Sequence, residues 1–217
     1  MLLLALDTAT PSIGVAICAD GRLLARRCVV DARRHNELLA VGIREVLREA
    51  NLTARQLDGV AVGVGPGPYT GLRVGLITAR SLGHALGIGV HGMCSLDVLA
   101  FAAARHEPGE FLVATDARRK EVYWARYLGS ERLAGPAVGR PAEVAWSGPV
   151  FGEGPVLYSE AFPDARTPVH PDPADLAAMV EARTAAGQPC LPPVPLYLRR
   201  PDAVEPGARK KVTGATA

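Results

Sequence analysis

The sequence predicts an α/β protein made of two related lobes. One observation is the order of elements in the first half, where three short apolar segments are followed by a helical pattern. The other is an internal repeat: residues 3–17 (LLALDTATPSIGVAI) align without a gap with residues 112–126 (LVATDARRKEVYWAR), so that Asp7 falls on Asp116. Each copy is an apolar strand, an aspartate at its end, a polar turn and an alternating strand. The match has few identities, but together with the element order it indicates two similar lobes.

Three consecutive strands are expected at the start of the chain. Residues 2–6 form an apolar run, residues 12–17 alternate with period two, and residues 21–30 follow a turn at Asp20-Gly21. The pattern then changes to helical spacing over residues 35–50, with apolar side chains on one stripe and glutamates and arginines on the opposite side. Strand, strand, strand and helix therefore open the first lobe.

The rest of the first lobe alternates between strand and helix patterns. Thr53 followed by Gln56 fits a capping box, and a buried strand is expected at residues 59–64. Residues 70–87 and 95–105 are expected to form two further helices. We place the end of this lobe at residue 108.

The second lobe, residues 109–205, is expected to be smaller. After Arg126 the chain is rich in proline and glycine, and one further helix is predicted at about residues 173–187. Six prolines follow Gln188, so the end of this lobe should be extended rather than helical. We expect residues 206–217 to be a disordered tail.

The composition is that of an ordinary globular protein, with 48% hydrophobic and 21% charged residues. A net charge of +2 is too small to indicate a nucleic-acid binder on its own. Four cysteines without a CxxC pattern favour a reducing compartment. The apolar start MLLLALD reaches Asp7 too early for a signal peptide or a membrane span. We expect a soluble, cytoplasmic protein that does not contact a membrane.

The glycine-rich stretch GVGPGPYTGLRVG, residues 63–75, does not fit a phosphate loop. No lysine follows it, and Pro66 and Pro68 have no N–H group to donate to a phosphate. The GxGxxG pattern also fails, because the sixth residue from Gly65 is Thr70. We interpret the stretch as a rigid corner between a strand and a helix, with Thr70 as the N-cap of that helix.

Small residues recur every four positions along the helix that follows. Glycine inside a helix costs roughly 1 kcal/mol relative to alanine, so such a row indicates close approach of another backbone. Two alternatives remain open: the row packs on the chain's own sheet or first helix, or it forms a helix–helix contact with another subunit. Under the second alternative the candidate interface residues are Gly71, Leu72, Gly75, Leu76, Ala79 and Gly83.

Four segments together resemble the bacterial TsaB (YeaZ) family: LALDTAT (4–10), the glycine-rich stretch with its helix, DARRKEVYWA (116–125) and PLYLRRPDA (195–203). The resemblance runs from about residue 1 to 205, and the combination is far more specific than any single motif. The family usually has Ser-Phe where this chain has Pro68-Tyr69, a departure that stiffens the corner and keeps an aromatic ring.

The resemblance implies an actin-like (ASKHA) two-lobed fold, with a mixed sheet and flanking helices in each lobe. It also implies a role in making N6-threonylcarbamoyladenosine in tRNAs that read ANN codons. Proteins of this family bind the catalytic paralogue TsaD, and the ATPase TsaE joins them. The resemblance further implies that first-lobe helices form both the homodimer and the TsaD contact. Transfer RNA would be met only within that assembly, no cofactor of this chain's own is implied, and ATP or ADP would lie at the complex interface.

Little in the chain points to chemistry of its own. Asp7 and Asp116 are the acids that an actin-like phosphotransferase would place around a nucleotide, and Thr8, Thr10 and Ser12 would line its first phosphate turn. The alternative, which we favour, is that Asp7 and Thr10 shape the hairpin through hydrogen bonds to the backbone. We expect no metal site, because HNELL (35–39) has leucine where a second histidine would be needed. No GxSxG elbow or nucleophilic cysteine is recognisable, so we assign no catalytic residue.

The leading hypothesis is therefore a non-catalytic partner subunit of the threonylcarbamoyl transferase complex. A minimal ASKHA-type ATPase or phosphotransferase that uses Asp7 and Asp116 is the alternative. A third hypothesis is direct tRNA binding through the basic cluster Arg118, Arg119 and Lys120, which is otherwise interpreted as solvated surface.

Overall fold

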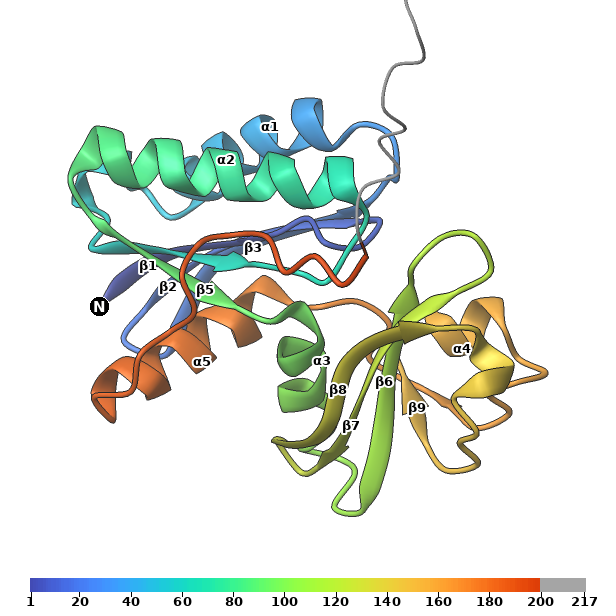
Figure 1. Ribbon diagram of the computed structural model, residues 1–217. Coiled ribbons are helices and arrows are strands. Elements are labelled where there is room, and N and C mark those ends of the chain that lie inside the picture. Colours follow the sequence, from blue (N-terminus) through green and yellow to red (C-terminus); the bar gives the residue numbers. More distant parts are fainter. Residues whose placement is uncertain (200–217) are drawn as a thin grey trace, which may run out of the picture.

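The computed structural model describes residues 1–199, which form two lobes with one sheet each (Figure 1). The sheet of the first lobe has the strand order β3-β2-β1-β4-β5. The first three strands are an antiparallel meander, and β4 and β5 run parallel to β1. The bounds are β1 Leu2–Asp7, β2 Ser12–Ala19, β3 Arg22–Val30, β4 Gly59–Gly63 and β5 Gly89–Met93. The three opening strands and the fourth strand expected from the sequence are confirmed.

The second sheet repeats this topology. Its order is β10-β9-β6-β7-β8, with an antiparallel meander of β6, β7 and β8 and with β9 parallel to β6. The bounds are β6 Glu110–Asp116, β7 Val122–Leu128, β8 Glu131–Gly139, β9 Val150–Phe151 and β10 Ala165–Arg166. Asp7 ends β1 and Asp116 ends β6, as the internal repeat predicts. The two mixed sheets with flanking helices confirm the predicted two-lobed fold class.

Two long helices cover one face of the first sheet (Figure 1): α1, His35–Glu49, and α2, Tyr69–Leu86. Between them lies a short 3₁₀ turn, η1, Ala54–Gln56, where the Thr53 N–H donates to Gln56 Oε1 at 2.8 Å and closes the predicted capping box. The N-cap of α2 is Pro68, so the expectation that Thr70 caps this helix is wrong. Pro68 makes no side-chain capping bond, and Thr70 falls inside the first turn.

The opposite face of the first sheet is covered by a helix from much later in the chain, α5, Pro173–Ala185. Its buried residues Leu176, Ala177 and Val180 pack with Leu3 and Ala5 of β1. The region assigned to the second lobe, 109–205, thus includes a helix that completes the core of the first. Three shorter helices lie elsewhere: α3, Ser95–Ala103, η2, Pro141–Glu143, and α4, Gly154–Leu157.

Residues 188–199, here called the C-terminal strap, run back across the first lobe toward the second (Figure 1). Leu191 pairs with Gly92 of β5, and the Leu196 N–H donates to the Val64 carbonyl at 2.8 Å. The strap ends in an ion pair between Arg199 and Glu121 of the second lobe. The extended conformation expected for this part is confirmed. The tail expected at 206–217 lies outside the described residues.

All four cysteines are free thiols. In the part of the chain that the structure describes, no helix combines the length and the hydropathy that a bilayer span requires.

We predict that Leu176→Ala lowers the free energy of unfolding by about 2–5 kcal/mol, because Leu176 is fully buried between α5 and the first sheet. Urea denaturation followed by circular dichroism measures this. The matched control is Leu23→Ala on β3, where leucine is 42% exposed. If both variants lose the same stability, α5 does not complete the first core.

Candidate functional site

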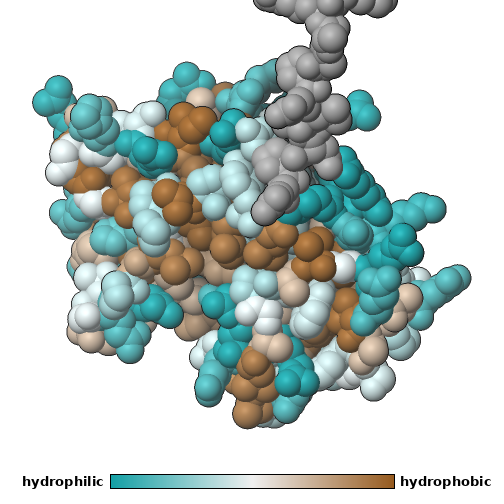
Figure 2. All heavy atoms as spheres, viewed as in Figure 1, coloured by the Kyte–Doolittle hydropathy of each residue, from teal (hydrophilic) through white to brown (hydrophobic). Residues whose placement is uncertain are grey.

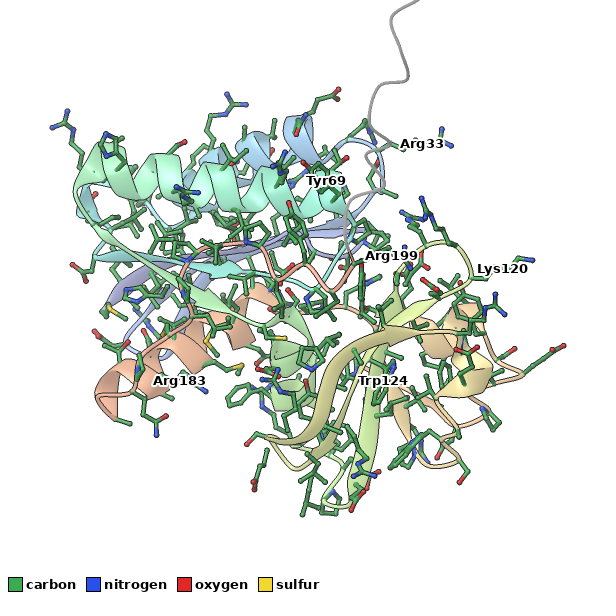
Figure 3. The ribbon with its side chains drawn as sticks, in the orientation of Figure 1. Arg33, Tyr69, Lys120, Trp124, Arg183 and Arg199 are labelled. Carbon is green, nitrogen blue, oxygen red and sulfur yellow. The ribbon has the colours of Figure 1, made fainter. Side chains whose placement is uncertain are left out.

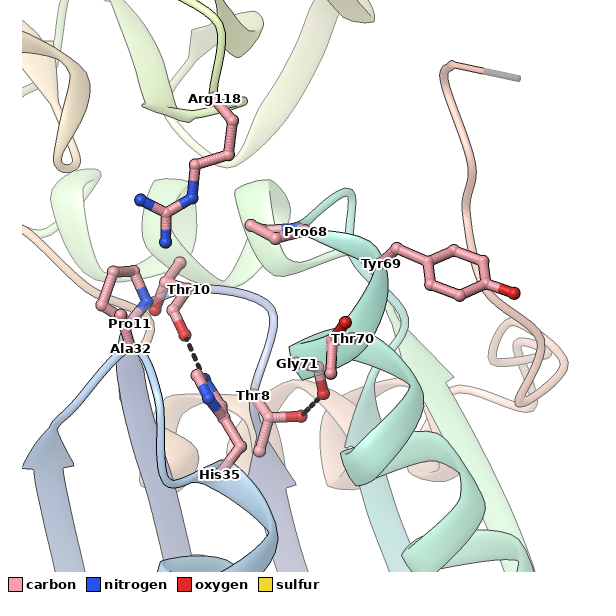
Figure 4. A pocket seen from close by; sticks show the side chains of 10 residues that line it. All are labelled: Thr8, Thr10, Pro11, Ala32, His35, Pro68, Tyr69, Thr70, Gly71 and Arg118. Carbon is pink, nitrogen blue, oxygen red and sulfur yellow. Dashed lines mark hydrogen bonds between the residues drawn. The ribbon is translucent and has the colours of Figure 1, made fainter. Parts of the chain in front are cut away.

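A cavity of about 240 Å³ opens where β1, α1 and α2 meet and Arg118 of the second lobe approaches (Figure 4). We call it the interlobe pocket. The first lobe supplies three threonines to the pocket wall: Thr8 and Thr10 follow β1, and Thr70 lies in the first turn of α2. The lining residues are Thr8, Thr10, Pro11, Ala32, His35, Pro68, Tyr69, Thr70, Gly71 and Arg118.

Asp7 is turned into the protein and is only 2% exposed. Its carboxylate accepts hydrogen bonds from the Ala9 N–H and from the Ser95 hydroxyl, each at 2.7 Å. Gly63 lies so close that a Cβ there would stand 1.9 Å from Asp7 Oδ2. Burial raises the pKa of Asp7, and the two hydrogen bonds offset only part of that rise. The carboxylate therefore joins the end of β1 to the start of α3.

Thr8 and Thr10 also bond to backbone groups. The Thr8 hydroxyl donates to the Gly71 carbonyl at 2.8 Å and accepts from the Gly75 N–H at 3.1 Å. Thr10 Oγ1 accepts from the Ser12 N–H at 3.3 Å, and the Thr10 carbonyl lies 3.1 Å from His35 Nε2 (Figure 4). Of the two alternatives left open for these residues, shaping the turn is the role that the observed hydrogen bonds support.

The second repeat uses the same turn. Arg118 follows Asp116 by two positions, as Ala9 follows Asp7, and its N–H donates to Asp116 Oδ1 at 2.9 Å. The Arg118 guanidinium also pairs with Asp116 at 3.3 Å. The charge of Asp116 contributes, after burial, to raising the pKa of Glu153 and Tyr158. The two related aspartates thus have different neighbours: Asp7 lies in the first core, and Asp116 lies among polar groups of the second lobe.

The sequence did not single out His35 or Arg118 as pocket residues. The repeat gave no signal for Arg118, because Ala9, the equivalent position in the first copy, does not line the pocket. His35 also lacks such a signal, because its side chain reaches the pocket only through the placement of α1 beside the loop of residues 8–11. Among residues 1–199, no three His, Cys, Asp or Glu side chains converge as a metal site would need.

The small-residue row on α2 faces inward, which corrects its assignment as a contact with another subunit. Gly71, Leu72, Gly75, Leu76, Ala79 and Gly83 are all buried within the chain. A Cβ on Gly75 would stand 2.4 Å from Thr8 Oγ1, and one on Gly83 would stand 2.3 Å from Val90. The glycines therefore allow α2 to lie close to the end of β1 and to β5. The alternative of packing against the chain's own sheet is the one observed.

The opposite side of α2 is exposed. Tyr69 and Ile77 are 46% and 60% exposed, and Arg73 lies between them. A hollow of about 490 Å³ runs beside these residues and reaches Asn36 of α1. Tyr197 of the strap stacks on Tyr69 with a centroid distance of 5.5 Å, and Arg73 donates to its hydroxyl at 3.1 Å. We call Tyr69, Arg73, Val74 and Ile77 the outer α2 face. Figure 2 shows hydrophobic residues gathered in a band across this side of the molecule.

Comparison with known proteins agrees with this fold. The family model described as "TsaD: tRNA N6-adenosine threonylcarbamoyltransferase" matches residues 29–201. Among solved structures, YeaZ of Pseudomonas aeruginosa has a TM-score of 0.78 and 29% identity, over 91% of this chain and 100% of that chain.

Among curated relatives, a protein of Mycobacterium leprae is 46% identical over 93% of this chain, and the match spans 56% of that protein's length. A protein of Mycobacterium tuberculosis is 45% identical over 92% of both chains. The tRNA threonylcarbamoyladenosine biosynthesis protein TsaB of Escherichia coli is 33% identical over 60% of this chain and 57% of its own length.

The two similar lobes, with the same turn at the end of each first strand, define an actin-like protein. The chain belongs to the TsaD-type family, within its TsaB (YeaZ) group.

We predict that Asp7→Asn changes the pH dependence of stability. Because the folded-state pKa of Asp7 is raised above 3.8, the folded protein holds this proton more tightly than the unfolded chain. The wild type therefore loses stability as pH rises from about 4 through the raised pKa, and Asp7→Asn loses less over that range. Thermal melts between about pH 4 and pH 8 measure this. Parallel curves for the two proteins would contradict it.

We also predict that Gly75→Ala lowers the free energy of unfolding by about 1–3 kcal/mol, although alanine favours the helix, because the methyl group displaces the Thr8 hydroxyl. Gly75→Leu should not fold. The exposed position Ser81 provides the control, and Ser81→Ala should change stability by less than about 0.5 kcal/mol. A folded, fully stable Gly75→Leu protein would contradict this prediction and would indicate that the small residues of α2 face a surface instead.

Proposed function

We propose that this chain is a non-catalytic partner subunit in the biosynthesis of N6-threonylcarbamoyladenosine in tRNA. Membership in the TsaB (YeaZ) group supports a place in this pathway, since relatives of that group carry the pathway in their names. The partner is a TsaD-like catalytic paralogue. In this proposal the chain needs no cofactor of its own, works in the cytoplasm and meets tRNA only in the assembly.

The burial of Asp7 supports a non-catalytic role. A magnesium–nucleotide centre needs carboxylate oxygens that are free to face the ligand. Here both hydrogen-bonded oxygens of Asp7 point to Ala9 and Ser95, and Gly63 closes the remaining side. Asp7 therefore has the position of a nucleotide-binding acid, but its hydrogen bonds are those of a residue that holds the first lobe together.

The single observation that carries the proposed partner contact is the exposure of the outer α2 face. Ile77 is 60% exposed in the middle of a long helix, next to a hollow shared with α1. The inward glycine row leaves this side as the one available for a helix of another subunit. We propose that the TsaD-like partner packs here, that a homodimer uses the same face, and that a TsaE-like ATPase joins the resulting complex.

The interlobe pocket is the observation behind the alternative, a minimal ATPase, although neither Asp7 nor Asp116 lines it. Three threonines, the first turn of α2 and the Arg118 cation form its walls. Purified protein with Mg-ATP distinguishes the two functions. Turnover that disappears in Asp7→Asn, while that variant stays folded, would favour the enzyme. ATP or ADP in the partner-subunit proposal is instead placed at the complex interface.

We predict that Ile77→Asp abolishes the complex with the TsaD-like protein of the same organism, because a carboxylate would be buried without a partner in the contact. Sizing with light scattering on mixtures of the two proteins measures this. Val156→Asp is the matched control, since Val156 is 63% exposed but lies on the second lobe. Wild-type protein should form an equimolar complex. If Ile77→Asp forms it equally well, the contact lies elsewhere.

A further inference from the structure

The second lobe carries a groove that the proposed partner contact does not use. Two adjoining hollows of about 410 and 530 Å³ share Pro141, Ala142, Glu160 and Ala161. One wall is η2 with the loop that follows it, and the other is the end of α4 with the residues that follow it. Both walls lie at the outer edge of the second lobe (Figure 1). We call this the η2–α4 groove.

Two cationic side chains stand at one end of the groove, Lys120 and Arg140. Lys120 extends outward from the hairpin between β6 and β7 (Figure 3). Residues 118–120 have consecutive φ values of 62°, 56° and 61°, so three residues with side chains occupy the left-handed region. This backbone directs Arg118 to the interlobe pocket and Lys120 to the groove. Among the described residues that line the two hollows, Glu160 is the one carboxylate, while Asp116 and Glu153 lie near Tyr158.

Two aromatic rings line the groove, and each is anchored from below. Trp146 donates its indole N–H to the Pro149 carbonyl at 3.1 Å, and Gly148 packs against the ring. Tyr158 and Trp146 both rest on the buried cluster that includes Leu112 and Phe162. Because both rings are only partly buried, each presents surface to the groove on a rigid support.

We propose that the η2–α4 groove binds a single-stranded segment of RNA. Aromatic rings offer stacking surfaces to bases, and cations beside them neutralise the phosphates that connect those bases. An acidic peptide could pair with the two cations, but its carboxylates would not stack on the two aromatic rings as bases do. The hollows are also large enough for a nucleotide. This inference rests on the proposed function, which makes a tRNA loop the RNA that the assembly must hold.

The test uses the full chain and a labelled anticodon stem-loop RNA, with binding measured by fluorescence anisotropy. The double variant Lys120→Gln/Arg140→Gln should bind at least about tenfold more weakly at about 50 mM salt, and the slope of log K against log salt should shrink by about 1.4. Tyr158→Leu, which keeps apolar bulk, should bind about 5- to 100-fold more weakly. Glu160→Gln should bind more tightly, because it removes the carboxylate that repels phosphate.

The matched control is Arg44→Gln/Arg80→Gln, which removes the same charge from exposed positions on α1 and α2. An equal loss of RNA affinity in this control would show that binding is diffuse electrostatic attraction, and it would overturn the proposal that the groove is the binding site. No binding by the wild type would overturn it as well. Displacement of the RNA by polyglutamate as readily as by unlabelled RNA would overturn it in favour of an acidic peptide.

The outcome is separable from that of the proposed function. Melting curves establish that each variant is folded, and light scattering with the TsaD-like partner reports the protein contact independently. RNA binding that depends on Lys120 and Tyr158 would stand even if no complex forms. A complex that forms without any RNA binding by this chain would leave the proposed function intact and overturn the groove.

Discussion

The close approach of α2 to the carboxyl end of β1 is the contact on which the rest of the first lobe depends. Thr8 joins the two elements by donating to the Gly71 carbonyl and accepting from the Gly75 N–H. One residue earlier, the buried carboxylate of Asp7 bonds to Ser95 and so fixes the start of α3. Both contacts need glycine opposite, at Gly75 and at Gly63, because a methyl group at either position would overlap the polar atoms. The elements β1, α2 and α3 are therefore positioned relative to one another by two adjacent side chains.

This constraint determines which surfaces remain for other molecules. The glycine side of α2 is used inside the chain, together with Leu72 and Leu76, so the side of the helix that carries Tyr69 and Ile77 is left exposed. The strap then touches that outer side through the Tyr69–Tyr197 stack and reaches the second lobe at Glu121. A partner on the outer α2 face would thus meet a segment that also contacts the neighbouring lobe. The same chain segments serve both the internal packing and the external surface.

Local signals in the sequence were sufficient for β1 to β4, for β6 and β7, for the long helices and for the repeat, because alternation, helical spacing and the Asp-centred turn are properties of contiguous residues. They did not predict β5, β8, β9 or β10. Contacts between residues far apart in the sequence were harder to predict. The apolar stripe of α5 predicts that one face of this helix is buried, but it does not indicate which of the two sheets Leu176 packs against. In the same way, the small residues of α2 required a close neighbour, and whether that neighbour was Thr8 or another subunit depended on tertiary placement. Arg118 reached the interlobe pocket through the arrangement of two lobes, which no local pattern specifies.

The late position of α5 has a consequence for synthesis of the chain. Leu3, Ala5 and Ala61 lie on strands that are made early, yet their cover, Leu176 and Val180, follows the entire second sheet. At about 5–20 residues per second, the stretch from Met93 to Ala185 takes on the order of 5–20 s to emerge. During that time one apolar face of the first sheet has no helix of its own to cover it. Until α5 is translated, the nascent first lobe therefore exposes apolar surface of the kind that makes folding intermediates prone to aggregation.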